Sequence, residues 1–208
     1  MPLLKIIEPT AKSKLLIWHV TESLDELKTI SLTTHSEERV SKMKNEMAQK
    51  AFLSVRHLLK IAGYADEDVT YNQNGKPFLS DGKSISISHS FEYAVIAINE
   101  NDYIGVDIEK KRDKIVRIAK KFIGSEKSFV NMETDIDKLT RIWGAKESLF
   151  KIHPEGAIQF DTHLLISPFE MHDSKTKGRI HKNNFDETFT VFFEEFNGFC
   201  LVYALKMD

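Results

Sequence analysis

The chain has 208 residues, of which 41% are hydrophobic and 29% are charged. That balance is typical of a globular protein and excludes a disordered or fibrous one. The 29 basic and 31 acidic side chains give a formal charge of −2, which argues against a surface that binds nucleic acid over its whole area. The single cysteine, Cys200, excludes an internal disulfide and a cysteine-rich zinc site.

The first twenty residues carry several charges and no continuous apolar run. We therefore expect neither a signal peptide nor a transmembrane span, and no association with a membrane. A cytoplasmic protein is the expectation that follows.

Apolar periodicity and turn residues predict helices followed by an antiparallel hairpin in the first half of the chain. Capping residues and glycine mark where the helices begin and end. The predicted elements are a strand at 14–20, a helix at 24–30, a helix from Ser36 to Gly63, a turn at Asn74–Gly75, and strands at 84–88 and 93–98.

The second half repeats this order of helix, irregular segment and hairpin. Its predicted elements are a strand at 103–109, helices at 114–122 and 138–151, and strands at 188–193 and 199–205. The hairpins at 85–98 and 189–204 are separated by about a hundred residues. This spacing predicts an α+β protein built from two similar halves, residues 1–100 and 101–208, each with an antiparallel sheet.

Two carboxylates lie on the strand at 103–109. Asp107 and Glu109 are two residues apart, so their side chains project from the same face of the strand. Like charges at that distance repel each other unless a cation lies between them. Oxygen ligands suit Mg²⁺, so the pair is a candidate metal site, with a solvated strand end as the alternative.

The helix at 138–151 breaks its own apolar pattern. Lys146 occupies a position where the apolar stripe requires a hydrophobic residue, and such violations are more frequent at functional sites. Glu147 and Lys151 lie one turn apart on one face, where an ordinary helical ion pair is the alternative. Gly144 within the helix costs about 1 kcal/mol relative to alanine, which again suggests a packing or functional reason.

Three further features are generic when taken one at a time. Ser88 and His89, at a predicted strand end, are suited to a phosphate pocket, although a capped turn is the commoner case. Lys76 and Pro77 follow the Asn74–Gly75 turn, and Arg56 lies upstream on a helix.

The order of these motifs is more specific than any one of them. Gly75-Lys76-Pro77, Ile87-Ser88-His89-Ser90, Ile104 to Glu109, and Trp143-x-x-Lys146-Glu147-Ser148-x-x-Lys151 follow one another along residues 36–160. Together they resemble the 4′-phosphopantetheinyl transferases of the surfactin-synthetase-activating type.

That resemblance implies a fold and a reaction. The fold is a pseudodimer of two similar α+β halves with the site at their interface, the N-terminal half on the coenzyme A side and the C-terminal half on the metal and catalytic side. The reaction is that of a holo-[acyl-carrier-protein] synthase. It transfers the phosphopantetheine arm of coenzyme A to a serine of an acyl or peptidyl carrier protein, depends on Mg²⁺ and releases adenosine 3′,5′-bisphosphate.

The resemblance also implies roles for single residues. Glu147 is the expected base for the carrier serine, Lys151 the expected contact to the coenzyme A phosphates, and Lys146 is expected beside the metal carboxylates. The expected metal ligands are Asp107, Glu109 and Glu147. The other expected coenzyme A contacts are Arg56 at the 3′-phosphate, Lys76 and Pro77 near the adenine, and Ser88 and His89 at phosphates.

A basic segment follows the predicted metal strand. Residues 110–127 hold eight basic and two acidic side chains, a net charge of +6 within a chain whose total is −2. Because carrier proteins of this class are acidic around their serine, we expect the segment to attract and seat the carrier protein. The expected contacts are Lys111, Arg112, Arg117, Lys120 and Lys121.

Two other functions compete with this interpretation. Glu109-Lys110-Lys111, with Asp102 or Asp107, matches a short metal-dependent nuclease pattern, and a coenzyme A or carrier-binding module without chemistry is the non-enzymatic alternative. Neither the carrier protein served nor the range of acyl-coenzyme A accepted follows from the sequence. An internal duplication makes a monomer the expected state.

Overall fold

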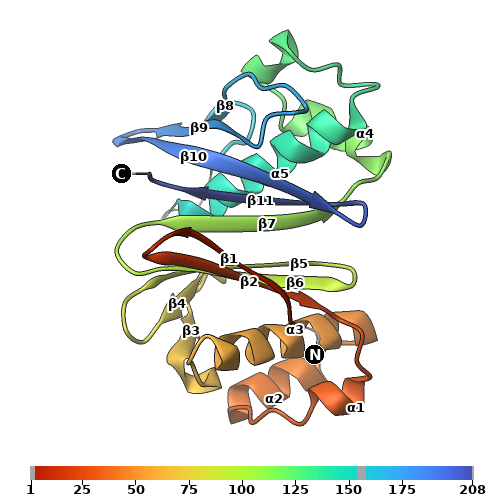
Figure 1. Ribbon diagram of the computed structural model, residues 1–208, viewed down its shortest axis with the longest axis vertical. Helices are drawn as coiled ribbons and strands as arrows, with labels where there is room; N and C mark the ends of the chain where they lie inside the picture. Colours follow the sequence, from red (N-terminus) through yellow and green to blue (C-terminus); the bar gives the residue numbers. More distant parts are fainter. Residues whose placement is uncertain (1–2, 154–157, 208) are drawn as a thin grey trace. The chain divides into compact units, whose positions relative to one another are not determined.

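The computed structural model describes residues 3–153 and 158–207 of the chain. The contacts divide the chain into two units, Met1–Asp102 and Tyr103–Asp208. Each unit contains one large antiparallel sheet and one long helix packed against it (Figure 1). The N-terminal unit has in addition a two-stranded antiparallel sheet of β3 and β4. This confirms the predicted α+β class with antiparallel sheets, whereas the internal duplication stays a prediction.

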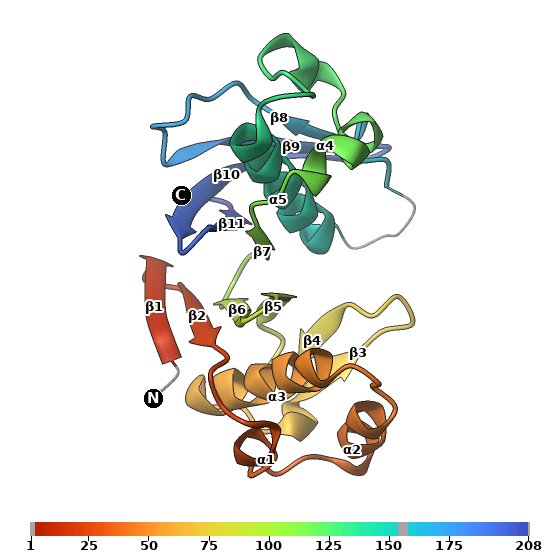
Figure 2. The same cartoon turned by 90° about the vertical axis from the view of Figure 1, so that its right-hand side faces the viewer.

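The N-terminal unit is built on a four-stranded sheet of order β1-β2-β6-β5. Its long helix α3 packs on β2 and β6 (Figure 2). Side chains such as Leu16, Leu53 and Ile96 fill the core of this unit. The elements are β1 (Leu3–Thr10), β2 (Ser13–His19), α1 (Leu24–Leu27), α2 (Thr34–Ser41), α3 (Glu46–Ile61), η1 (Asp66–Asp68), β3 (Val69–Tyr71), β4 (Pro77–Leu79), β5 (Ser84–Ser90) and β6 (Tyr93–Asn99).

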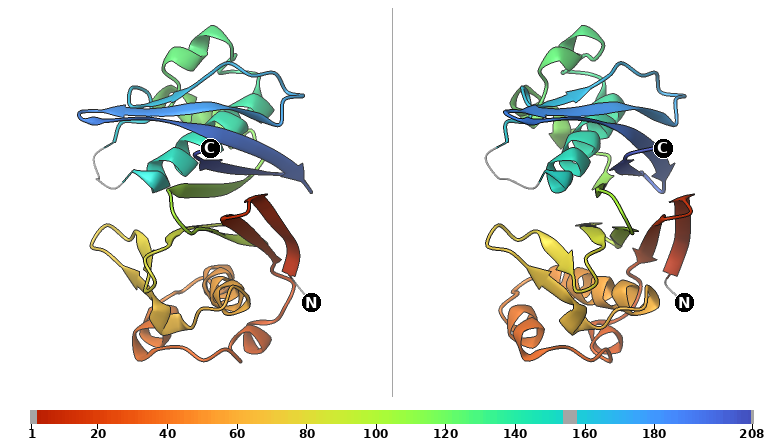
Figure 3. Two further views of the ribbon diagram at one scale, coloured as in Figure 1. Left: turned by 60° about the vertical axis from the view of Figure 1, so that its left-hand side comes forward. Right: turned by 90° about the vertical axis from the view of Figure 1, so that its left-hand side faces the viewer.

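The C-terminal unit has a five-stranded sheet of order β7-β11-β10-β9-β8, with α5 packed mainly against β7 and β11 (Figure 3). Leu139, Ile142 and Leu149 of α5 pack with Val202 and Ala204 of the sheet in one hydrophobic core. The elements are β7 (Ile104–Lys110), α4 (Lys114–Ile118), η2 (Ala119–Lys121), η3 (Ser125–Ser128), α5 (Ile136–Ile152), β8 (Leu164–Ile166), β9 (Lys175–Lys182), β10 (Phe185–Phe196) and β11 (Phe199–Leu205).

Three predicted helices differ from the structure. The helix expected at 24–30 ends at Leu27. The helix expected from Ser36 to Gly63 is split into α2 and α3, because the side chain of Asn45 accepts a hydrogen bond from Ala48 N and starts a new helix. The helix expected at 114–122 ends at Ile118 and continues as the 3₁₀ turn η2. None of the helices that the structure describes has the length and apolar character needed to cross a bilayer.

Candidate active site

One face of β7 packs against helix α5. Gly105, Asp107 and Glu109 share this face because strand side chains alternate. A Cβ built on Gly105 would lie 1.9 Å from the carbonyl oxygen of Ser148, so only glycine lets the helix come this close. The Ser148 hydroxyl lies 2.8 Å from Gly144 O and 3.0 Å from Val202 O, which further fixes α5 on the sheet.

Asp107 is held from the last turn of α5. Its side chain is buried, and its Oδ1 accepts a hydrogen bond from Lys151 Nζ at 2.8 Å. The same ammonium group donates to the carbonyl oxygen of Val106, also at 2.8 Å. Lys151, expected at the coenzyme A phosphates, therefore lies directly at the candidate metal carboxylate and neutralises it in the metal-free protein.

Glu109 is held by an aromatic residue. The indole Nε1 of Trp143 donates to Glu109 Oε1 at 3.3 Å. Burial and the charge of Asp107 raise the pKa of Glu109, while the Trp143 hydrogen bond opposes that rise. The sequence motif contained Trp143 but assigned it no role, so this contact to an expected metal ligand is a finding of the structure.

Glu147 completes the group from the middle of α5. Burial, followed by the charge of Asp107, raises the pKa of Glu147 to about 7, and the charge of Lys151 only partly offsets this. Glu109 adds a smaller repulsion of the same sign. The negative charges of Asp107 and Glu109 thus both act on Glu147, although Asp107 and Glu147 are 40 residues apart in sequence.

The donor set suits a hard divalent cation. All three groups are carboxylates. Burial and then neighbouring negative charge raise the pKa of Glu109 and of Glu147, and a cation would cancel the effect of that charge. Across residues 3–153 and 158–207, however, no three acidic, histidine or cysteine side chains form a ready metal cage. Mg²⁺ does not require one, because it takes one or two carboxylates and completes its shell with water and substrate phosphate.

Lys146 does not lie where the sequence placed it. Its side chain is fully buried, forms an ion pair with Glu126 at 2.9 Å, and donates to the carbonyl oxygens of Phe122 at 2.7 Å and Phe160 at 2.9 Å. The expected contact with the metal carboxylates is thus corrected. Lys146 is one residue from Glu147, and a helix turns by roughly 100° per residue, so the two side chains leave α5 in different directions.

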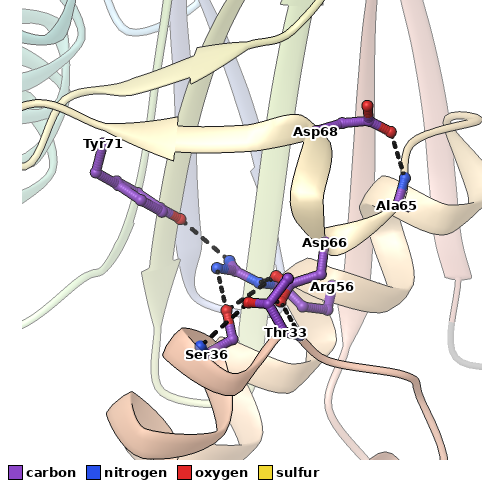
Figure 4. Close-up of polar contacts among 7 residues, drawn as sticks. All are labelled: Thr33, Ser36, Arg56, Ala65, Asp66, Asp68 and Tyr71. Atoms are coloured by element: carbon purple, nitrogen blue, oxygen red, sulfur yellow. Dashed lines mark hydrogen bonds and ion pairs between the residues drawn. The ribbon is translucent and has the colours of Figure 1, made fainter.

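Arg56 also has partners inside its own unit (Figure 4). It is buried, its Nε donates to Asp66 Oδ1 at 2.7 Å, its Nη1 donates to the Tyr71 hydroxyl at 3.1 Å, and its guanidinium stacks on the ring of Phe52 at 3.9 Å. Asp66 in turn accepts hydrogen bonds from the amide and hydroxyl of Thr33. These contacts give Arg56 a structural role, and the expected contact to a 3′-phosphate is not needed to explain its burial.

The other expected coenzyme A contacts lie at two places in the N-terminal unit. Lys76 ends the β3–β4 connection and Pro77 begins β4. Asn72 Oδ1 accepts a hydrogen bond from Lys76 N, and burial lowers the pKa of Lys76. Ser88 and His89 both lie within β5, not in a turn, so their side chains point to opposite faces of the sheet. The two side chains therefore do not line one phosphate pocket on this strand.

The C-terminal unit resembles known proteins. A sequence model of the 4′-phosphopantetheinyl transferase superfamily matches residues 103–204, the stretch that carries Asp107, Glu109, Glu147 and Lys151. The chain is similar to this superfamily over nearly the whole of its C-terminal unit.

A curated relative agrees with this resemblance. The 4′-phosphopantetheinyl transferase gsp of Aneurinibacillus migulanus is 28% identical to the chain over 152 residues, which cover 69% of this chain and 61% of the relative. The chain thus spans less than two thirds of the length of the curated relative that it matches. The shared region extends beyond the 102 residues of the family match.

The basic segment that follows β7 divides into two groups of residues. Lys111 forms ion pairs with Glu195 at 2.6 Å and Asp137 at 3.3 Å, so it holds β7 to the rest of its unit. Arg112 and Arg117, by contrast, are exposed and line a groove of about 290 Å³. The other lining residues of this groove are Glu109, Lys110, Lys114, Ile115, Ile118, Thr140 and Trp143. Lys120 and Lys121, on η2, are exposed as well.

The raised pKa of Glu147 predicts how the stability of the protein depends on pH when no divalent cation is present. Folding raises this pKa from 4.5 to about 7, so between these values the folded chain binds more protons than the unfolded chain. Its contribution to stability is therefore complete below about pH 4.5 and is lost as the pH rises through about 7. Urea unfolding in EDTA should show a falling free energy of unfolding over this range. Glu147→Gln should flatten that slope, and an equal slope in both proteins would contradict the assignment.

Proposed function

We propose that the chain transfers the 4′-phosphopantetheine arm of coenzyme A to a serine of an acyl or peptidyl carrier protein, in a reaction that depends on Mg²⁺. The observation that carries the proposal is the approach of Glu147 to Asp107 and Glu109 within the stretch that matches the transferase superfamily. The match to the superfamily model by itself supports the reaction class. The three carboxylates supply chemistry that fits this reaction.

In this reaction one bond to phosphorus forms and one bond to phosphorus breaks. The serine Oγ of the carrier attacks the β-phosphorus of coenzyme A, and the bond from that phosphorus to the bridging oxygen breaks. Adenosine 3′,5′-bisphosphate leaves with the electron pair. Because phosphoryl transfer needs little covalent help from a protein, positioning and charge neutralisation dominate catalysis.

Side chains of the C-terminal unit match the needs of this step. The carboxylate of Glu147 takes the serine proton as the new bond to phosphorus forms. The ammonium group of Lys151 lies 2.8 Å from Asp107 Oδ1 and offers a positive charge to the phosphate oxygens. Asp107, Glu109 and Glu147 would hold the cation, which when bound neutralises charge on the pyrophosphate.

One assay separates this proposal from its competitors. The protein is incubated with coenzyme A, Mg²⁺ and an apo carrier protein, and the carrier is weighed by mass spectrometry. A mass gain of one phosphopantetheine arm is the expected result. DNA cleavage without that gain would favour the nuclease, and binding of coenzyme A with neither reaction would favour the non-catalytic module.

We further propose that the exposed part of the basic segment seats the carrier protein. The groove beside Glu109 has an apolar floor that includes Ile115 and Ile118, and its rim carries Arg112 and Arg117. An acidic partner is attracted by such a rim, and it would bring its serine next to an expected metal ligand. The ion pairs of Lys111 make this residue a poor candidate for direct contact, although the sequence favoured it.

Charge reversal tests the docking surface. Arg112→Glu with Arg117→Glu should raise KM for the carrier protein by about tenfold at low salt, with KM for coenzyme A unchanged, because steering acts on the acidic partner. The measurement is steady-state transfer with each substrate varied in turn.

Lys175→Glu with Lys177→Glu is the matched control, since it makes the same change of charge at exposed positions of β9. Equal effects of the two double variants on the carrier KM would refute a docking role for the groove.

A further inference from the structure

The fully buried ion pair of Lys146 and Glu126 is satisfied on every side. The Lys146 ammonium group has three acceptors, namely Glu126 Oε1 at 2.9 Å and the carbonyl oxygens of Phe122 and Phe160. Glu126 Oε1 also accepts from Ile166 N at 2.9 Å, and its Oε2 accepts from Gly124 N at 3.0 Å. A buried pair of charges is tolerated only with such complete partners, so its position is specified tightly.

The pair joins two chain segments that regular secondary structure does not hold together. Phe122 and Gly124 lie between η2 and η3, and Phe160 lies before β8. A Cβ on Gly124 would lie 1.9 Å from the carbonyl oxygen of Asp161, so the two backbones touch at this point. Lys146 therefore fixes both backbones to the middle of α5.

Phe122 and Phe160, whose carbonyl oxygens bind Lys146, also pack their rings against Trp143. The Trp143 ring stacks on Phe160 with centroids 5.4 Å apart, and it meets the edge of Phe122 at 5.1 Å. The backbones that bind the ammonium group thus carry the rings that set the angle of the indole. Through its Nε1 the indole donates to Glu109, the expected metal ligand on β7.

We infer that Lys146 and Glu126 are positioning residues that orient Trp143 and, through it, the Glu109 carboxylate. The chain of contacts runs from the buried pair to the backbones of Phe122 and Phe160, from their rings to Trp143, and from the indole to Glu109. The last step, from an oriented carboxylate to a bound cation, rests on the proposed function. This accounts for a lysine in the apolar stripe of α5 without placing it at the metal.

The test removes both charges together, because one alone would remain uncompensated in the core. Glu126→Gln with Lys146→Met should leave the chain folded by far-ultraviolet circular dichroism. It should abolish the near-ultraviolet circular-dichroism band of Trp143, and the spectrum of Trp143→Phe identifies that band. It should also weaken the binding of Mn²⁺ alone by about tenfold or more, the loss typical when a residue that hydrogen-bonds a metal ligand is changed. Adding Trp143→Phe to the double variant should cause no further loss of affinity, since both changes act on the same contact.

Two more variants keep the result decisive. Ile180→Ala, in the core of the same unit, controls for general loss of stability and should leave both readouts unchanged. Glu126→Asp keeps both charges but shortens the acid, and it carries the test if the double variant does not fold. An unaltered Trp143 band and unaltered Mn²⁺ affinity in a folded variant of the pair would overturn the inference. If the wild-type protein transfers no phosphopantetheine, only the proposed function is refuted. The Trp143 band still tests whether the buried pair orients Trp143.

Discussion

Replacing Glu147 by glutamine should lower kcat/KM for phosphopantetheine transfer by about 10²- to 10⁴-fold, the range expected when a positioned base is removed. Glutamine has nearly the same shape but cannot accept the proton of the carrier serine. The side chain is half-buried and its charged form is disfavoured by burial and by Asp107, so the neutral amide should not destabilise the fold. Transfer rates and urea unfolding of the same preparations measure both effects.

The matched control is Glu170→Gln. Glu170 is an exposed acid of the same unit, 3.8 Å from Lys138 in a weak surface ion pair. It should transfer at the wild-type rate. Activity of Glu147→Gln within about a factor of ten of wild type would fall below the range for a general base and would contradict that role.

Gly105→Ala should destabilise the protein by about 3 kcal/mol or more, at the upper end for overpacking of a core. The new methyl group would lie 1.9 Å from Ser148 O and 2.8 Å from Ser148 C, and these are backbone atoms of α5 that cannot turn aside. The strand and the helix must therefore separate. If some folded protein remains, it should also have lost activity, because the movement separates Asp107 from Glu147.

Gly82→Ala provides the comparison for this loss of stability. Gly82 has φ of 79°, and a Cβ built on it would have no atom of the described chain within 4 Å beyond its own chain neighbours. Alanine there costs only the strain of a left-handed backbone, about 1 to 2 kcal/mol. Thermal unfolding of both variants should place Gly105→Ala well below Gly82→Ala, and the reverse order would mean that α5 is free to move away from β7.

Strands and helices with a clean period were predictable from the sequence. Alternation found β5 and β7, the apolar run at 93–98 found β6, and the apolar stripe found α5. The edge strand β1 was missed because none of its residues is buried and its sequence does not alternate between polar and apolar residues. The break between α2 and α3 was missed because apolar residues continue across it, although Asn45 followed by Glu46 is a recognisable helix start.

The candidate site was predictable only in part, since a motif gives residue types and not their partners. Asp107 and Glu109 were predicted as a pair because they share one face of a strand, and Glu147 was added by the resemblance of its motif to the transferase family. Their role as metal ligands stays a prediction. The role of Lys146 was not predicted, because its partner Glu126 lies 20 residues away in a 3₁₀ turn with no periodic signal. The two carbonyl acceptors of Lys146 are backbone atoms, which no residue identity reveals.

The buried pair of Arg56 and Asp66 has a consequence for the protein in a living cell. It ties the start of α2, through Thr33, to α3 and η1, and removing either charge would leave the other unpaired in the interior. A loss of stability of this kind reduces the amount of protein that survives chaperones and proteases. Mutations at these two positions should therefore appear in a cellular screen as low abundance, with the surviving molecules retaining their ordinary turnover.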